Sequence, residues 1–170
     1  MKRASINEQY CSIARPAAQL IDAWSFLILR EVFLGNCRYD GIRVQTGMSP
    51  RSLALRLALL VENGILEKVP YQESPLRHQY NLTEKGLDLA PVMDTLRLWG
   101  EKWLGPWGPE GPPIRVEHKG HNHDLELGFV CKECGEPVDV WSGEVHMSRR
   151  MQRERQKMIQ RSSSQRKSQA

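Results

Sequence analysis

The stretch from residue 49 to residue 86 constrains the fold more than any other part of this 170-residue chain. Ser49 followed by Pro50 predicts a helix start, because a serine oxygen can accept from an unpaired amide and proline suits the first helical position. Gly64 predicts the end of this helix, since glycine readily adopts the left-handed conformation found there. Apolar residues recur at helical spacing in between and predict one buried face, at Leu53, Leu57 and Leu60.

Two short segments rich in strand-forming residues follow, at residues 65–71 and 78–82. The residues between them, Glu73, Ser74, Pro75 and Leu76, indicate a turn, so the pair predicts a hairpin. A further short helix is predicted before residue 49, from Arg38 to about Gln45, and a tight turn at Gly47 separates the two helices. Two helices that run directly into a hairpin are the layout of a winged helix-turn-helix, which reads DNA with the second helix and contacts its backbone with the hairpin.

Further helices are predicted on both sides of this motif. One runs from Ser12 to about Leu20, and a dense apolar helix follows and ends at Gly35. After the hairpin, a long helix is predicted from Thr83 to about Leu104. A kink is expected near residues 87–91, because Pro91 interrupts the hydrogen-bond ladder.

Apolar residues of the long helix alternate at steps of three and four, which suits packing along another helix: Leu89, Val92, Leu96, Trp99 and Trp103. A second subunit could cover this face, or the N-terminal helix of the same chain could, and both can hold at once. The predicted fold class is therefore mainly α (α+β): a winged helix-turn-helix with a two-stranded wing, a long C-terminal dimerisation helix and a small C-terminal β knuckle.

Composition divides the chain into four predicted segments. Residues 11–104 form the DNA-binding and dimerisation domain, residues 105–113 a Gly/Pro-rich linker, residues 114–146 a small Cys/His segment, and residues 147–170 a basic tail, disordered or frayed helical. The net charge is +2 over residues 1–104, −5 over the linker and Cys/His segment together, and +7 over the tail. The basic balance thus comes from the tail, so it does not by itself argue for DNA binding.

The composition also narrows the class of protein. No apolar run approaches the roughly 18 residues that would span a bilayer, and the first residues carry no apolar signal region. A cytoplasmic protein without a membrane partner is therefore expected. Four cysteines in a chain of this length do not indicate a secreted disulfide framework.

A set of motifs in a fixed order carries a resemblance that covers roughly half the chain, from Cys11 to about Trp103. The set comprises Cys11, the WSFLILR block at 24–30, Gly35, Arg38-Tyr39, Ser49-Pro50, Leu53, Arg56-Leu57, Gly64, Tyr80, the LTEKG run at 82–86, Ala90-Pro91-Val92 and Trp99-Gly100. In this order and spacing, the chain resembles the HxlR family of bacterial transcriptional regulators, relatives of the MarR group. The resemblance implies a homodimeric winged-helix DNA binder that represses or activates nearby genes. Three residues depart from the common pattern and should alter packing rather than role: Ala23, Ser25 and Cys37.

The helix predicted at about residues 50–63 is the candidate recognition helix. Its uncovered side near the start carries Arg51, Ser52 and Leu55. An arginine can bind a guanine edge, a serine can form adaptable hydrogen bonds, and an exposed leucine can contact a thymine methyl. Ser49 lies at the helix start, and Arg56 lies at the flank, where it either contacts a base or only orients the helix on phosphate. Other candidates are predicted to contact the DNA backbone or minor groove: Arg77 and His78 in the wing at about 72–80, and Arg38 and Arg43 on the preceding helix.

Cys131 and Cys134 lie in a Cys-x-x-Cys knuckle, whose spacing lets two thiolates share a tetrahedral zinc ion. A full site needs two more ligands, and His118, His121 and His123 lie just upstream. The predicted ligand set is Cys131, Cys134, His118 and either His121 or His123. Longer members of the resembled family often pair such a knuckle with an upstream Cys-Gly-His group, whose cysteine is missing here. A knuckle without metal therefore remains the alternative.

Cys11 stands at a position that some members of the resembled family use to sense oxidants or electrophiles. A cysteine near a helix N-terminus can have a lowered pKa. The alternative is a small buried residue near a dimer interface. Two other functions remain open: a winged-helix adaptor for protein contacts, and a zinc or thiol enzyme. Against the enzyme, no nucleophile, base and orienting residue are spaced for catalysis.

Overall fold

The computed structural model describes residues 6–20, 22–125, 127–139 and 143–167, with the side chains of the last helix described up to Gln160. The described residues belong to two compact units, one spanning residues 22–137 and the other combining the chain before residue 22 with the chain after residue 137. Parts of the predicted segments lie outside the described residues: residue 21 of the DNA-binding domain, residues 126 and 140–142 of the Cys/His segment, and residues 168–170 of the tail. The predicted division into four segments stays a prediction.

Three helices build the core of the first unit: α3 (Ala23–Phe33), α4 (Tyr39–Thr46) and α5 (Pro50–Glu62). Their inward side chains are less than 2% exposed, together with two residues that lead into the hairpin: Ile28, Leu29, Ile42, Leu53, Leu57, Leu60, Ile65 and Leu66. The burial of these eight apolar side chains supplies most of the stability of a domain of this size. The periodicity of the sequence correctly predicted the buried face of α5.

Local signals set the ends of these helices. Ser49 caps α5, and its Oγ accepts from the Ser52 amide at 3.3 Å. Gly47 has φ +68° and ends α4, while Gly64 has φ +65° and follows the last turn of α5. Both angles lie in the left-handed region that favours glycine, so the turn between α4 and α5 and the exit from α5 are encoded locally.

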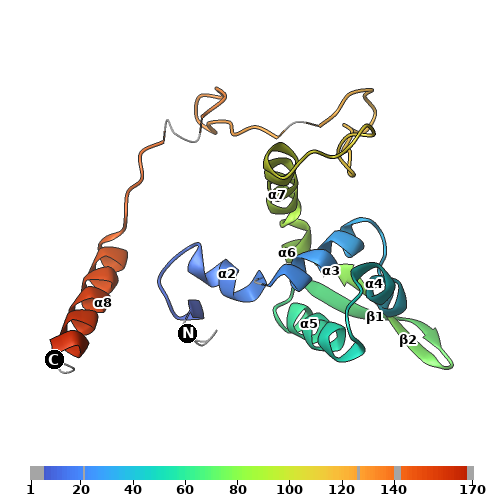
Figure 1. The fold of residues 1–170 in the computed structure, drawn as a ribbon, viewed down its shortest axis with the longest axis horizontal. Coiled ribbons are helices and arrows are strands. Elements are labelled where there is room, and N and C mark those ends of the chain that lie inside the picture. The colour runs from blue at the N-terminus through green and yellow to red at the C-terminus, as the bar shows by residue number, and fades with distance from the viewer. Residues whose placement is uncertain (1–5, 21, 126, 140–142, 168–170) are drawn as a thin grey trace. The chain divides into compact units, whose positions relative to one another are not determined.

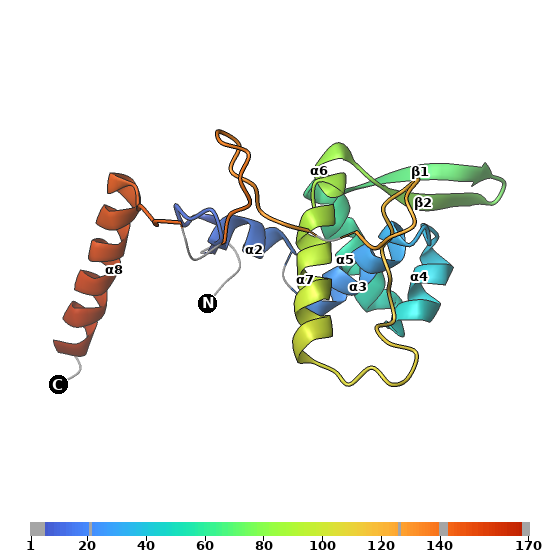
Figure 2. The same ribbon diagram turned by 90° about the horizontal axis from the view of Figure 1, so that it is seen from above.

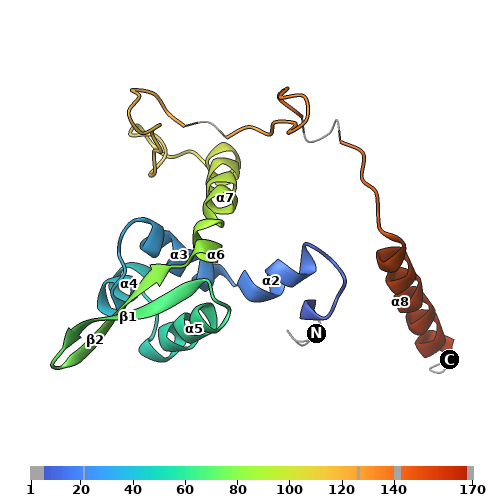
Figure 3. The same cartoon turned by 180° about the vertical axis from the view of Figure 1, so that it is seen from behind.

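Strands β1 (Leu66–Glu73) and β2 (Leu76–Leu82) form an antiparallel hairpin. Both are longer than predicted, so only Ser74 and Pro75 remain in the turn. The hairpin extends beyond the helices of this unit (Figures 1 and 3), as a wing does. Its base is anchored to the start of α4, where the Tyr80 amide donates to the Cys37 carbonyl at 2.8 Å.

The prediction of a single long helix from Thr83 to about Leu104 is wrong in one respect. The chain forms two helices there, α6 (Glu84–Leu87) and α7 (Ala90–Trp103). Pro91 lies in the first turn of α7, where a missing amide costs nothing, and Asp88 caps the end of α6. The proline therefore separates two helices instead of kinking one.

After α7 the chain turns back toward α3 (Figure 2) and continues as the appended segment, residues 105–137. A small β knuckle was predicted here, and in the described residues it is limited to single antiparallel bridges. Only two isolated bridges form, Glu117 with Asp124 and Val130 with Pro137, and no described residue from 114 to 137 is buried. The segment has no apolar core, and short paired strands are only marginally stable in water without one.

The second unit contains α2 (Ala14–Leu20) and α8 (Arg149–Lys167). Pro16 lies in the first turn of α2. Most of the basic tail lies in α8. Within this unit the Arg150 guanidinium lies 4.2 Å from the centre of the Tyr10 ring, and Glu154 accepts from the Tyr10 amide at 3.1 Å.

Candidate nucleic-acid interface

The outer face of α5 is the part of this helix that the domain leaves uncovered. Arg51 is exposed, Leu55 is 59% exposed and Ser52 is half-buried, whereas Leu53, Leu57 and Leu60 on the opposite side are at most 1% exposed. The first turn of α5 carries no acidic residue that would repel phosphate. The helix can therefore present a basic and partly apolar surface to a duplex.

The angle between α4 and α5 is held by a contact that the sequence did not reveal. The Tyr39 hydroxyl donates to the Pro50 carbonyl at 2.9 Å. Pro50 lies at the start of α5, so this bond ties the first turn of the recognition helix to the first turn of α4. This bond fixes the direction in which the first turn of α5, with the exposed Arg51, leaves the turn after α4.

Arg56 has a different role from the outermost residues of α5. Its Nε donates to Asp22 Oδ1 at 3.0 Å and its Nη1 donates to Ser52 Oγ at 2.7 Å, and its side chain is 19% exposed. The guanidinium is thus already used within the protein, joining α5 to the start of α3. This geometry favours an orienting role for Arg56 over direct base reading.

Asp22 also caps α3, because its Oδ1 accepts from the Ser25 amide at 2.8 Å. Partial burial by itself would raise the pKa of Asp22. The hydrogen bonds from Arg56 and Ser25 outweigh burial and lower the pKa of this carboxyl below its ordinary value. Asp22 is therefore held as a carboxylate at neutral pH. No signal in the sequence paired it with a residue 34 positions away.

In the wing, Arg77 is exposed and His78 is half-buried on β2. An irregularity of the strand register between Pro70 and Gln72 lies opposite these two residues. Such bulges bend a strand and redirect its side chains. The wing prediction thus falls on residues that the structure leaves accessible.

Arg38 and Arg43 lie on the α4 side of the interface. The Arg38 guanidinium lies 4.5 Å from the centre of the Tyr71 ring of β1, which places an exposed cation against the wing. Arg43 is half-buried in the last turn of α4. The sequence analysis named both arginines and missed Tyr71, which no motif distinguished from other strand aromatics.

The outward face of α7 is apolar and uncovered by the described residues. Val92, Leu96, Trp99 and Trp103 are 49%, 47%, 54% and 64% exposed. These residues belong to the apolar seam expected from the sequence. An apolar stripe of this kind marks a surface for association.

Cys11 lies just before α2, where its Sγ accepts from the Ala14 amide at 3.4 Å. This bond and a weaker one from the Ile13 amide lower the pKa of the Cys11 thiol, against a smaller opposing effect of burial. All four cysteines are free thiols. Cys11 can therefore react as a thiolate more readily than an ordinary cysteine.

The structure assembles only part of the predicted metal site. His118, His121 and His123 offer ring nitrogens that all lie within 4.8 Å of one another, but the cluster does not include Cys131 or Cys134. The two cysteines lie on a separate turn, where the Cys134 and Glu133 amides and then the Cys134 side chain lower the pKa of Cys131. The mixed set of cysteines and histidines is thus not brought together, and the histidines alone offer three ligands that suit a transition metal.

The geometry defines a class of protein: a winged-helix DNA-binding protein, in which one face of α5 is uncovered. Residues 20–107 match the family model described as HxlR-like helix-turn-helix, and the chain belongs to this family. It is a DNA-binding transcriptional regulator, as the resemblance implied. No helix in the described part of the chain has the length and apolar character that crossing a membrane requires.

Curated relatives agree with this assignment. An uncharacterised HTH-type transcriptional regulator of Mycobacterium tuberculosis is 37% identical over 127 residues, covering 75% of this chain and 79% of that protein. An uncharacterised HTH-type regulator of Synechocystis is 36% identical over 95 residues, covering 55% and 70%. The longer of these matches extends beyond the winged-helix domain.

Solved structures show the same fold. The crystal structure of PA1607, described as a candidate transcription factor, has a TM-score of 0.74 and 30% identity, covering 85% of this chain and 99% of that chain. The redox regulator HypR in its reduced form has a TM-score of 0.51 and 25% identity, covering 54% and 92%.

Proposed function

We propose that the chain binds double-stranded DNA as a homodimer, with α5 in the major groove and the β1–β2 wing on the backbone or in the minor groove. The observation that carries this proposal is the division of α5 into one face at most 1% exposed and an opposite face presenting Arg51, Ser52 and Leu55. Ser49, Arg38, Arg43, Arg77 and His78 surround this face and supply the other contacts, while Arg56 orients α5 through Asp22.

Replacing Arg51 by alanine tests the base-reading part of the proposal. The variant should lose about 1–3 kcal/mol of binding free energy on the best operator and should relax sequence preference at one position of each half-site. Gel retardation on DNA upstream of the chain's own gene, followed by selection from random duplexes, measures both. Lys102→Ala on α7 is the matched control. Unchanged affinity and preference in R51A would contradict the proposed docking.

Replacing Arg77 by alanine tests the wing. Here we expect weaker binding to all sequences alike and a slope of affinity against salt that is shallower by about 1, because one phosphate contact is lost. Titrations at four salt concentrations give the slope. The docking of the wing is wrong if the slope of R77A equals that of the parent protein.

The homodimer is supported by the exposed apolar stripe of α7, and the N-terminal helix is the second element that we expect in the dimer interface. A lysine at Trp99 places a charge in the middle of this stripe, so W99K should be monomeric at micromolar concentration. Analytical ultracentrifugation reports the mass. Lys102→Glu is a charge-changing control on the same helix, and a dimeric W99K would refute this interface.

We also propose that Cys11 is an oxidant-sensitive thiol. Its lowered pKa supports this, as does the likeness to HypR, which is named a redox regulator. Diamide should weaken DNA binding of the parent protein and leave C11S unaffected, with C37S as the matched control. Equal loss of DNA binding in C11S and the parent would exclude a role for Cys11.

A further inference from the structure

Three exposed histidines lie together on one turn of the appended segment. The rings of His118 and His121 are stacked with centroids 4.2 Å apart, and the His123 ring lies 5.4 and 5.5 Å from these two. One ring nitrogen of each residue lies within 4.8 Å of the other two. In the described part of the chain, no other group of three His, Cys, Asp or Glu side chains gathers in this way. The three residues, the histidine cluster, are therefore a candidate set of metal ligands.

The backbone of the turn explains why the three side chains meet. The His118 amide donates to the His123 carbonyl at 3.1 Å, and the His121 amide donates to the His118 carbonyl at 2.9 Å. Between them, Gly120 has φ +85°, in the left-handed region that favours glycine. Backbone hydrogen bonds and one glycine thus fold the chain so that the three rings lie on the same turn.

His123 is oriented as metal-binding histidines commonly are. Its Nδ1 lies 3.0 Å from the Asp124 carbonyl oxygen. A carbonyl oxygen can only accept, so the ring donates from Nδ1 and the lone pair of the neutral ring is on Nε2. Metal-bound histidines usually donate their second ring N–H to a carbonyl or carboxylate, which fixes the tautomer and raises the basicity of the ligand. The contact therefore prepares His123 to bind a metal through Nε2.

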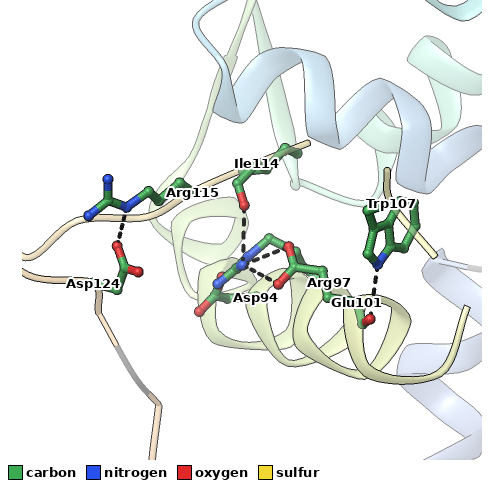
Figure 4. A network of polar contacts seen from close by, with 7 residues as sticks. All are labelled: Asp94, Arg97, Glu101, Trp107, Ile114, Arg115 and Asp124. Atoms are coloured by element: carbon green, nitrogen blue, oxygen red, sulfur yellow. Dashed lines mark hydrogen bonds and ion pairs between the residues drawn. The ribbon is translucent and has the colours of Figure 1, made fainter. Parts of the chain in front are cut away.

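The acidic side chains beside the histidine cluster are engaged by an arginine. Arg115 is paired with Asp124 (Figure 4). Its Nη1 also lies 3.4 Å from Glu117 Oε1. These ion pairs occupy carboxylates that would otherwise attract Mg²⁺ or Ca²⁺, which prefer oxygen ligands. Imidazole nitrogens suit zinc, copper and nickel, so the donor set favours a transition metal.

The spacing of the nitrogens fits a tetrahedral ion. Zinc holds nitrogen ligands at about 2.0–2.1 Å, which places them roughly 3.3 Å from one another. Small rotations of exposed side chains are enough to bring nitrogens that lie within 4.8 Å of one another to this distance. Because all three histidines are exposed, the fourth position of the ion is open to water. Three histidines with one open position are a known arrangement for zinc.

We propose that the histidine cluster binds one divalent transition-metal ion per chain, of the kind that prefers imidazole ligands, such as Zn²⁺. The ion is held by His118, His121 and His123 and crosslinks the turn, while Cys131 and Cys134 take no part. The inference goes beyond the proposed function and does not rest on it, because the ion is bound in the absence of DNA.

The test uses the full chain without an affinity tag, freed of metal by a chelator. Zn²⁺ is titrated by calorimetry, and Co²⁺ is titrated by absorption spectroscopy. We expect one Zn²⁺ per chain, no binding of Mg²⁺, and a Co²⁺ spectrum without the intense near-ultraviolet charge-transfer band that thiolate ligands produce. A thiolate band, or failure of Zn²⁺ to bind, would overturn the proposal.

Substitution of one ligand identifies the residues that hold the ion. His118→Gln should weaken Zn²⁺ binding by at least about tenfold. His146→Gln is the matched control, since His146 is an exposed histidine of the other unit, and it should bind as the parent does. The double variant C131S/C134S should also retain the parent affinity. Unchanged affinity in H118Q, or a loss of the same size in C131S/C134S, would overturn the proposal.

A second variant keeps all three histidines and changes only the backbone of the turn. A Cβ at Gly120 would meet nothing within 4 Å, but alanine is strained at φ +85°. An exposed turn can relax this strain when no ion holds it, so Gly120→Ala should weaken Zn²⁺ binding by at least about threefold. Gly128→Ala is the matched control in the same segment, because its Cβ is equally unobstructed and its φ lies outside the left-handed region. Equal affinity of G120A and the parent protein would show that this turn is not the geometry of the site, which also overturns the proposal.

Discussion

The winged-helix part (residues 22–104) and the appended segment (residues 105–137) are held in different ways. The first has eight large side chains less than 2% exposed, whereas no described residue of the second from 114 onward is buried. The winged-helix part is stabilised by its apolar core, and the appended segment by a few polar contacts with α7. The difference teaches that a domain with an apolar core can carry a segment whose local stability rests on few polar contacts and is correspondingly lower.

The largest contrast should come from removing one apolar side chain in each region. Leu57 is 1% exposed, so Leu57→Ala should cost about 2–5 kcal/mol of unfolding free energy. Val130 is 58% exposed, and Val130→Ala should change it by less than about 0.5 kcal/mol. Guanidinium titrations followed by tryptophan fluorescence measure both. Similar losses would mean that the appended segment shares the core.

The Asp22–Arg56 ion pair joins α5, the candidate recognition helix, to the start of α3. Asp22→Ala removes the cap of α3 and the ion pair, and should cost about 2 kcal/mol; Asp22→Asn retains a capping side chain and should cost about half of that.

This cost should depend on pH. Because the folded-state pKa of Asp22 is lowered, its contribution is present above the unfolded pKa and is lost as the pH falls through the folded value. The stability difference between the parent and D22N should therefore shrink between pH 6 and pH 3. A difference that stays constant over this range would show that the charge of Asp22 is not involved.

Breaking the attachment of the appended segment should affect that segment more than the core. Arg97→Met retains much of the side-chain volume but removes the bonds to Asp94, Glu101 and Ile114. We expect about 1 kcal/mol of lost stability and clearly faster amide exchange in residues 107–127, with α5 unchanged. Hydrogen exchange with mass spectrometry resolves the two regions, and Lys102→Met is the control. Faster exchange in α5 as well would show that the regions are not separable.

The smallest effect on global stability should come from the histidine cluster. Zn²⁺ should slow amide exchange around residues 117–124, with less than about 0.5 kcal/mol of change in core unfolding, and a chelator should reverse it. His121→Ala should abolish the protection and His146→Ala should preserve it. If C131S and C134S abolish the protection and H121A does not, the cysteines hold the metal.

Local signals made much of the winged-helix part predictable. Ser49, Gly47 and Gly64 act within one turn of their own positions, and the leucines of α5 recur at a period set by the helix itself. The sequence correctly predicted an interruption near Pro91, but it predicted a kink where the structure has two separate helices. Asp88 ends the first of them before the second begins. The exposure of Arg51 and Leu55 on α5 followed from the same periodicity.

By itself, the sequence determined the order of helices and hairpin, the buried face of α5 and the family, since these depend on neighbours within a few positions or on motif order. Only the tertiary structure decided that Arg56 pairs with Asp22, that the three histidines gather without the cysteines, and that α3, α7 and the appended segment line one open pocket. Each of these joins residues from separate elements, and their pairing is set by packing geometry that no local pattern in the chain records.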